Sequence, residues 1–321
     1  MAEQWLAGID VGGTTIKMAF VSMEGEIIQK WEIPTDVSEG GKHITTHISS
    51  SLKHTLKTLG KEEGVLKGIG LGAPGFIEMK TGFIHQAVNI GWKDYPLKDE
   101  LEKETGLTVT VENDANMAAI GEMWKGAGNG ESDLLCVTLG TGVGGGIISN
   151  GQIVHGVNGM AGEIGHITSI TEGGAACNCG KTGCIETIAS ATGIARIAAV
   201  GMENHRDSSL YDIWKESKTL TAKDVAVEAE KGDAYAAQVL DEITFHLGLV
   251  VANLSNAINP GMIVIGGGVS SAGETLLRPL RTHFEKFALP RVAQGAQFAI
   301  ATLGNDAGVI GGAWLAKQSI K

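Results

Sequence analysis

Four residues with metal-binding side chains lie close together in the sequence, namely His166, Cys177, Cys179 and Cys184. One imidazole and three thiolates are a ligand set typical of a tetrahedral zinc ion, and protein atoms would fill all four positions. Cys177 and Cys179 are poorly placed to form a disulfide with each other, because a single residue separates them. The spacing therefore predicts a structural zinc site rather than a hydrolytic one, with an iron–sulfur cluster as the alternative.

Two acidic residues, Glu163 and Glu186, bracket this cysteine-rich loop. Each has a plain interpretation as a surface charge. If a metal anchors the loop, however, both carboxylates are expected near His166, whose second ring nitrogen stays available as a hydrogen-bond donor.

A polar pair, Asn113-Asp114, follows the apolar stretch that begins at Val109 and precedes a stretch typical of a helix. Either residue could simply cap that helix. Polar residues at the carboxyl end of a strand also face the crevice in which open α/β sheets bind ligands. There a carboxylate can accept a hydroxyl proton while an amide holds a second hydroxyl. We expect function as well as capping.

The chain contains 47 glycines in 321 residues, and glycines form the turns of two strand-turn-strand patterns. The first pattern turns at Gly12-Gly13-Thr14-Thr15, and the second at Gly140-Thr141-Gly142. A glycine hairpin brings backbone N–H groups against an anion without the help of a helix. Asp10 comes just before the first turn and is interpreted as a ligand of nucleotide-borne Mg²⁺, with a hydrogen-bonded turn aspartate as the alternative.

Two familiar phosphate motifs are excluded by their context. Gly140, Gly142 and Gly145 fit G-x-G-x-x-G, but a dinucleotide site needs a helix directly after the glycines, and a strand follows here. Gly180-Lys181-Thr182 is similar to the end of a P-loop, yet the position of that motif's first glycine, 175, holds alanine.

The two glycine hairpins match in the order of their elements, which an internal duplication explains most simply. The remaining chemistry-bearing segment is Gly266-Gly267-Gly268, a third site of close backbone approach after the strand 262–265. A long helix from 233 to 258, a strand at 298–303 and a helix at 307–317 complete the expected elements. We expect a first domain of residues 1–115, completed by 307–321, and a second domain of residues 116–306 with the metal loop 163–186.

The formal net charge of −11 argues against a nucleic-acid partner, because neutralising phosphates requires clustered Lys and Arg. The amino-terminal segment lacks a basic region, and Asp10 interrupts its apolar run, so no signal peptide is expected. No apolar run is long enough for a membrane span. Three of the four cysteines are clustered rather than dispersed. These features predict a reduced, cytoplasmic protein without a membrane partner.

Taken together, the motifs resemble those of the ROK (repressor, open reading frame, kinase) family of sugar kinases, and of its bacterial glucokinases in particular. The resemblance spans residues 9 to about 311, with the motifs in the family's order. It rests on Asp10–Thr14, Gly72–Gly75, Glu112–Asp114, Leu139–Gly146, Glu163–His166 and Cys177–Glu186.

The resemblance implies an α/β protein with an actin-like, hexokinase-type fold: two duplicated RNase H-like lobes with a cleft between them. It implies that Asp114 deprotonates the 6-hydroxyl of glucose as the general base, and that His166 both binds zinc and contacts the sugar. Other hydroxyls would be bound by Gly75, Asn113, Glu163, His166 and Glu186. ATP with Mg²⁺ would be held by Asp10, Gly12, Gly13, Thr14, Thr15, Lys17, Gly140, Thr141, Gly142 and Gly267.

Several alternatives remain open at this point. The sugar could be mannose, N-acetylglucosamine, N-acetylmannosamine or fructose, since kinases for these share the scaffold. A sugar-sensing ROK repressor without kinase activity is the main rival from another class, and an ATPase chaperone or filament of the same superfamily is a weaker one. The family also implies a homodimer or homotetramer.

Overall fold

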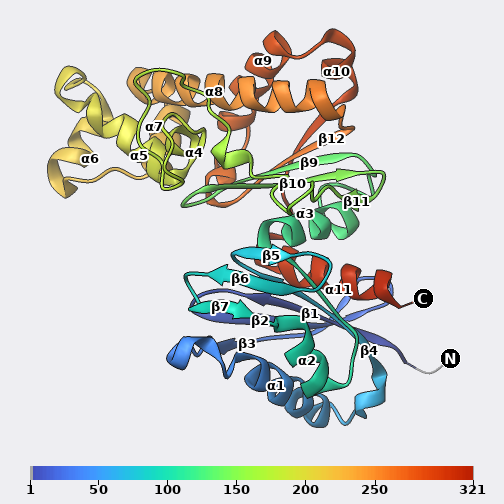
Figure 1. Ribbon diagram of the computed structural model, residues 1–321. Coiled ribbons are helices and arrows are strands. Elements are labelled where there is room, and N and C mark those ends of the chain that lie inside the picture. Colours follow the sequence, from blue (N-terminus) through green and yellow to red (C-terminus); the bar gives the residue numbers. More distant parts are fainter. Residues whose placement is uncertain (1–2, 321) are drawn as a thin grey trace. The chain divides into compact units, whose positions relative to one another are not determined.

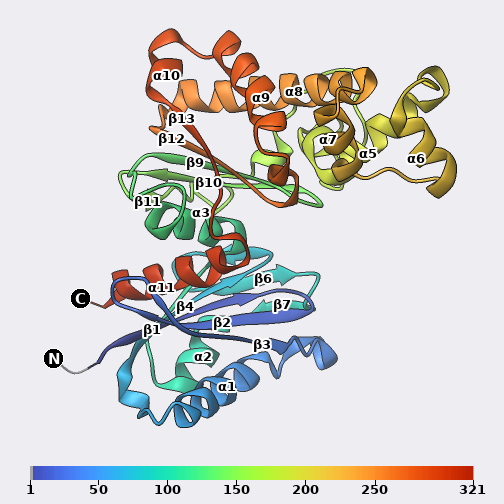
Figure 2. The ribbon, with the colours of Figure 1, turned by 180° about the vertical axis from the view of Figure 1, so that it is seen from behind.

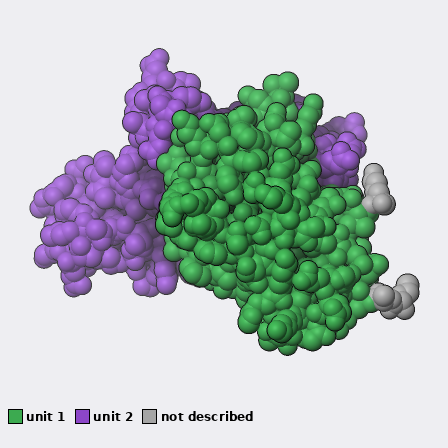
Figure 3. All heavy atoms as spheres, turned by 60° about the horizontal axis from the view of Figure 1, so that its bottom comes forward, with its two compact units in different colours: residues 1–130, 153–161, 303–321 green, residues 131–152, 162–302 purple. Residues whose placement is uncertain are grey.

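The computed structural model describes residues 3–320, which form two compact units (Figure 3). The first unit contains residues up to 130, residues 153–161 and residues from 303 onward; the second contains 131–152 and 162–302. The first unit therefore extends beyond the expected boundary at 115, because the helix that follows packs onto the carboxyl-terminal helix. Within the described range, none of the helices combines the length and the apolar character that crossing a bilayer demands.

The first unit is built on a five-stranded sheet in the order β3-β2-β1-β4-β8. β1 pairs antiparallel with β2 and parallel with β4, and β4 pairs parallel with β8. β1 and β4 are buried along nearly their whole length, as expected for apolar strands covered on both faces. The strands are β1 (Trp5–Val11), β2 (Thr15–Ser22), β3 (Ile27–Pro34), β4 (Leu66–Ala73) and β8 (Val109–Asn113).

Helices cover both faces of this sheet (Figure 1). On one face α1 (Ile44–Thr58) and α2 (Leu97–Thr105) contribute their apolar stripes to the main core of the unit. On the other face α11 (Ala307–Ser319) packs against β1 and β4, and α3 (Asp114–Lys125) packs against α11. A small antiparallel sheet completes the unit, formed by β5 (Phe76–Glu78), β6 (Phe83–Ala87) and β7 (Trp92–Tyr95).

The second unit repeats the same strand order, β11-β10-β9-β12-β13. Its strands are β9 (Leu134–Leu139), β10 (Val143–Ser149), β11 (Gln152–Ile153), β12 (Met262–Gly266) and β13 (Gln297–Ile300). β9 and β10 form an antiparallel hairpin, while β9, β12 and β13 are parallel, as β1, β4 and β8 are in the first unit. The equivalence of the two sheets confirms the predicted duplication, and the hairpin rules out the helix that a dinucleotide motif requires.

Helices also build the core of the second unit, with α8 as its longest member (Figure 2). β13 ends at Ile300 rather than at the expected residue 303. From residue 303 onward the chain belongs to the first unit, where the Leu303 amide donates a hydrogen bond to Glu122. The helices of this unit are α4 (Glu186–Ala189), α5 (Ala191–Val200), α6 (Ser209–Ser217), α7 (Ala222–Glu230), α8 (Ala234–Ile258), α9 (Glu274–Phe287) and α10 (Pro290–Gly295).

Glycines let α11 lie directly on the strands of the first sheet. A Cβ atom at Gly8 would overlap the backbone of Val309, and one at Gly70 would overlap the backbone of Gly312. These contacts are backbone to backbone, so no side chain can move aside to relieve them. Part of the chain's high glycine content therefore serves helix–sheet packing rather than ligand binding.

Gly70→Ala is expected to lower the free energy of unfolding by about 1–3 kcal/mol, because the added methyl group forces the backbone of α11 away from β4. Urea denaturation monitored by circular dichroism measures this change. The matched control is Gly64→Ala, since a Cβ at Gly64 meets open space. Equal stability of the two variants would contradict the close-packing explanation.

Candidate active site

The predicted polar residues of the first unit lie at one edge of its sheet. Asp10 is the register partner of Gly72 in β4, and Ala73 in β4 is the partner of Asn113 in β8. Parallel strands bring their carboxyl ends to the same edge, where α/β proteins bind ligands. The structure thus brings Asp10 and the Asn113-Asp114 pair together, although about a hundred residues separate them in the sequence.

Asn113 is the N-cap of α3. Its Oδ1 accepts hydrogen bonds from the amides of Ala115 at 2.9 Å and Asn116 at 3.2 Å. Capping is therefore confirmed, but it occupies only the oxygen of the side chain. Among the residues that the structure describes, Asn113 Nδ2 has no hydrogen-bond acceptor, so it can donate to a ligand while Oδ1 holds the helix.

Asp114 begins α3, and its Oδ1 accepts a hydrogen bond from the Ala115 amide at 2.8 Å. No side chain of residues 3–320 donates to its Oδ2. Burial raises the pKa of Asp114 above its ordinary value, in spite of the lowering effect of the amide. A solvent-accessible carboxyl group with one oxygen free of side-chain donors and a raised pKa is suited to accept a proton.

Burial also raises the pKa of Asp10, and the neighbouring Asp114 adds to this effect. Lys17, the register partner of Asp10 in β2, acts in the opposite direction. Two carboxylates near each other need cations to stay ionised together. Lys17 supplies one such charge, and carboxylate oxygens at this position fit a divalent cation with oxygen ligands.

The Gly12–Thr15 turn, which joins β1 to β2, has carbonyl oxygens that are already bonded. Thr35 donates through its hydroxyl to the Gly12 carbonyl at 2.7 Å and through its amide to the Thr14 carbonyl at 2.9 Å. Gly13 and Thr14 are exposed. Two of the carbonyls that would repel an anion are thus occupied, which favours phosphate at this turn.

Gly75 lies between β4 and β5 with a φ of +103°, a conformation that L side chains rarely adopt. A Cβ there would also overlap the backbone of Gln86 and Ala87. Glycine is required at this position for the fold, whatever further role its backbone has.

The corresponding turn of the second unit, Gly140–Gly142, borders a cavity of about 790 Å³. The carbonyls of Gly140 and Thr141 accept hydrogen bonds from the Ala191 amide at 2.8 Å and the Thr192 hydroxyl at 3.0 Å, both in the first turn of α5. A cavity of this size is typical of sites for small organic ligands. The predicted phosphate turn therefore opens onto space for the rest of a nucleotide.

Sequence reasoning missed most of this cavity's wall. It is lined by residues 221–223, 226, 227 and 230 around α7, and by residues 268–269 and 271–275 before and within α9. Residues 199–232 show no motif, and their local signals are helix caps, such as the capping box at Thr221 and Asp224. Gly267 has a φ of +80° and packs against the backbone of Leu139, so that Gly268 rather than Gly267 lines the cavity.

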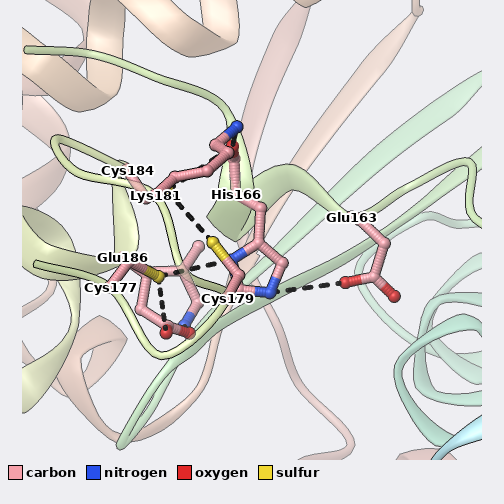
Figure 4. Close-up of polar contacts among 8 residues, drawn as sticks. Glu163, His166, Cys177, Cys179, Lys181, Cys184 and Glu186 are labelled. Carbon is pink, nitrogen blue, oxygen red and sulfur yellow. Dashed lines mark hydrogen bonds and ion pairs between the residues drawn. The ribbon is translucent and has the colours of Figure 1, made fainter. Parts of the chain in front are cut away.

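The four predicted metal ligands converge in the second unit (Figure 4). Their ligand atoms all lie within 4.8 Å of one another. Cys179 Sγ lies 3.7 Å from Cys184 Sγ, and Cys177 Sγ lies 3.6 Å from His166 Nδ1. Tetrahedral zinc with bonds of about 2.0–2.3 Å separates its ligands by about 3.4–3.8 Å, so the observed distances fit a zinc ion. They are far too long for a disulfide.

The electrostatics of the cluster also fit a bound cation. Burial raises the pKa of Cys184 to about 12, and its hydrogen bonds with Cys179 and Cys177 add to this effect. The thiolate form of Cys184 is therefore unfavourable without a positive ion. A divalent ion that binds thiolates removes this penalty.

His166 presents its two nitrogens to different neighbours. Nδ1 faces the sulfur cluster, while Nε2 lies 3.9 Å from Glu163 Oε2 (Figure 4). A ligand that occupies Nδ1 leaves Nε2 to carry the proton. The ring nitrogen expected to stay available is therefore Nε2, and its neighbour is Glu163.

Glu186 connects the metal loop to the phosphate turn within the second unit. Its Oε2 accepts a hydrogen bond from the Val143 amide at 3.0 Å, and its Oε1 lies 3.9 Å from Cys177 Sγ. A Cβ at Gly142 would collide with the same carboxylate. The side chain of Glu186 therefore contacts both the cysteine-rich loop and the end of the Gly140–Gly142 turn.

Comparison with known proteins gives consistent results. The family model for the ROK family matches residues 6–319. A glucokinase from Halalkalibacterium halodurans is 64% identical over 318 residues, which are 99% of this chain and 96% of that protein. A ROK family glucokinase from Streptomyces griseus, solved in complex with glucose and AMPPNP, is 35% identical with a TM-score of 0.77, over 98% of this chain and 100% of that chain.

The fold is shared with regulators as well as kinases. A ROK family transcriptional regulator, described as a homolog of the E. coli MLC protein, has a TM-score of 0.85 at 24% identity, over 99% of this chain and 78% of that chain. This likeness concerns the fold alone, so fold similarity does not separate a kinase from a sugar-binding regulator.

Asp114→Asn is expected to raise the Tm at pH 7–8, because it removes a carboxylate that burial disfavours in its charged form. The folded-state pKa lies above the unfolded one, so the destabilising charge is absent at low pH and forms as the pH rises through the folded-state pKa. Differential scanning fluorimetry should therefore give a larger gain at pH 8 than at pH 4.

The helix keeps its cap in this variant, because Asn113 is unchanged. Asp99→Asn, in the exposed first turn of α2, is the matched control and should change stability by no more than about 0.5 kcal/mol. A gain for Asp114→Asn that does not depend on pH would contradict the electrostatic explanation.

Proposed function

The chain belongs to the ROK family and has the actin-like α/β fold of its hexokinases and glucokinases, and on this premise we propose that it phosphorylates glucose at the 6-hydroxyl with ATP. The observation that carries the proposal is the Asn113-Asp114 pair. One oxygen of each side chain is engaged with the first turn of α3, and the remaining polar atom can meet a substrate. The 64% identity to a glucokinase selects glucose among the hexoses.

In this mechanism Asp114 Oδ2 accepts the proton of the 6-hydroxyl as its oxygen attacks the γ-phosphorus. The raised pKa of Asp114 brings its proton affinity closer to what general base catalysis needs. Asn113 Nδ2 donates to a neighbouring hydroxyl and fixes the sugar. The remaining hydroxyls are bound by the Gly75 backbone, Glu163, His166 and Glu186.

ATP is held mainly by backbone amides, which explains how an acidic chain can bind a polyanion. The turns Gly12–Thr15 and Gly140–Gly142 take phosphate oxygens, and Lys17 adds a positive charge. The Mg²⁺ ion that accompanies ATP neutralises phosphate charge, and Asp10 is the carboxylate suited to hold it. The 790 Å³ cavity beside Thr141 takes the nucleoside, and Gly267 packs against the Leu139 backbone next to it.

The cysteine cluster is proposed to hold a structural zinc ion. Four protein ligands leave no position for a reactive water, so the ion supplies rigidity rather than Lewis acid chemistry. Few regular elements support this loop. Two isolated bridges, Thr168 with Cys184 and Ala176 with Thr182, are its strand-like contacts within the described range. Zinc would therefore fix the positions of Glu163, Glu186 and the ring of His166.

The main alternative is a non-catalytic sugar-sensing protein. Such a protein would bind sugar but would not release ADP from ATP, so an assay of turnover distinguishes it from a kinase. The expected homodimer or homotetramer and the cytoplasmic location stay predictions. A panel of glucose, mannose, fructose, N-acetylglucosamine and N-acetylmannosamine distinguishes the sugars, and we expect the highest kcat/KM for glucose.

ADP release by the purified protein is expected to depend on glucose, and Asp114→Asn should lower kcat by about 10²–10⁴-fold with little change in glucose affinity. A coupled assay measures turnover, and quenching of tryptophan fluorescence or calorimetry measures glucose binding. Glucose binding without turnover in the wild type would favour the sensor. Near-normal turnover of the variant would restrict Asp114 to a structural role in α3.

One zinc ion per chain is expected from elemental analysis of protein purified without added metal. Cys184→Ser should lose the ion, lower the Tm and raise the KM for glucose, because the loop that carries His166 and Glu186 loses its anchor. Cys136→Ala removes a buried thiol outside the cluster and should retain the zinc. A folded, zinc-free Cys184→Ser protein with full glucose affinity would refute the coupling between the metal and the sugar.

A further inference from the structure

A buried acidic residue precedes the Asn113-Asp114 pair directly. The side chain of Glu112 is 4% exposed, and a buried carboxylate is costly unless donors surround it. Its Oε1 accepts hydrogen bonds from the Asn113 amide at 2.9 Å and from Asn116 Nδ2 at 3.0 Å. Its Oε2 accepts one from His155 Nε2 at 2.7 Å. Glu112 is thus bonded to both ends of the first turn of α3.

His155 comes from a segment remote in sequence. Residues 153–161 belong to the first unit, while the residues before and after them belong to the second. The segment closes on itself through a hydrogen bond from the Ala161 amide to the His155 carbonyl at 3.1 Å. Its imidazole is 35% exposed, and the hydrogen bond with Glu112 raises its pKa. When the imidazole is protonated, the pair combines a hydrogen bond with charge attraction.

The bonds of Glu112 help to fix the orientation of Asn113. The Asn113 amide is fixed by Glu112, while Oδ1 of the same residue caps α3 at the amides of Ala115 and Asn116. These bonds hold the residue from both sides and so orient Nδ2. Asp114 follows in the same turn, so its carboxylate is oriented by the same set of bonds.

We propose that His155 is a positioning residue for phosphoryl transfer, which acts through Glu112 to orient Asn113 and Asp114. This inference rests on the proposed function, since it assigns the two oriented side chains to the sugar. Loss of the His155 donor leaves Oε2 of the buried carboxylate without its hydrogen-bond partner, and Glu112 then shifts toward other donors or water. A displacement of Asp114 by about 1 Å is enough to cost about 10²-fold in rate.

The test compares His155→Ala with His155→Gln in the coupled ADP assay. We expect His155→Ala to lower kcat by about 10–100-fold while the KM for ATP changes less than about threefold. His155→Gln can place an amide donor near the position of Nε2 and should recover most of kcat. Should His155→Ala be too unstable to purify, His155→Asn replaces it, because its shorter side chain does not reach Glu112.

His283→Ala is the matched control, because His283 Nε2 also donates to a carboxylate, Asp241 Oδ1, at 2.8 Å, but in the second unit between α8 and α9. This variant should keep its kcat, whatever its stability. The free energy of unfolding is measured for every variant, so that a loss of folded protein is not counted as a loss of rate.

Three results would overturn the proposal. One is an unchanged kcat in His155→Ala, or in His155→Asn where that variant replaces it. Another is an equal loss of kcat in the Gln variant and in the shorter one, since hydrogen bonding would then not be the cause. The third is a higher KM for glucose with an unchanged kcat, which would make His155 a sugar contact. Absence of glucose-dependent turnover in the wild type refutes the proposed function instead, so the two failures are distinguishable.

Discussion

Parallel pairing of β1, β4 and β8 decides where the charged groups of the first unit can lie. The interiors of β1 and β4 are buried between helices on both faces, so polar side chains are tolerated where the strands end. Asp10 and Asn113 occupy such ends, and Glu112 is accepted one residue earlier because three donors surround it. The glycines that let α11 approach the sheet also shape this edge, since Gly308 leaves room for the carboxylate of Asp10.

The acidic residues of this edge illustrate three ways of keeping a carboxylate in a partly buried place. Asp10 has Lys17 beside it and fits a metal ion; Glu112 is paired with His155; Asp114 has a single amide donor. Asp114 is thus the least compensated of the three, and burial raises its pKa. This is the arrangement that the proposed role of Asp114 as a general base requires, because a carboxylate that the protein bonds fully is a weaker proton acceptor.

In the second unit, the functional residues lie on a loop with little regular structure, residues 163–186, which other contacts must hold in place. The cysteine cluster brings distant parts of this loop together. Glu186 then links the loop to the β9–β10 turn by a hydrogen bond from the Val143 amide. The position of the cysteine cluster is therefore linked, through Glu186, to the position of the β9–β10 turn. The carbonyls of that turn are held in addition by α5, so its shape depends on two independent sets of contacts.

Local patterns in the sequence predicted the hairpins, the duplication, the cap of α3 and the metal ligands, because each depends on residues that are close in the chain. Family resemblance added roles for the remaining motif residues. Tertiary structure alone placed α3 in the first unit, through its packing on α11. It also formed a cavity wall from residues 221–230, which carry no motif, and paired His155 with Glu112 across 43 positions of sequence. Such contacts leave no local signature, since they arise from how distant segments pack and from the need of a buried charge for a partner.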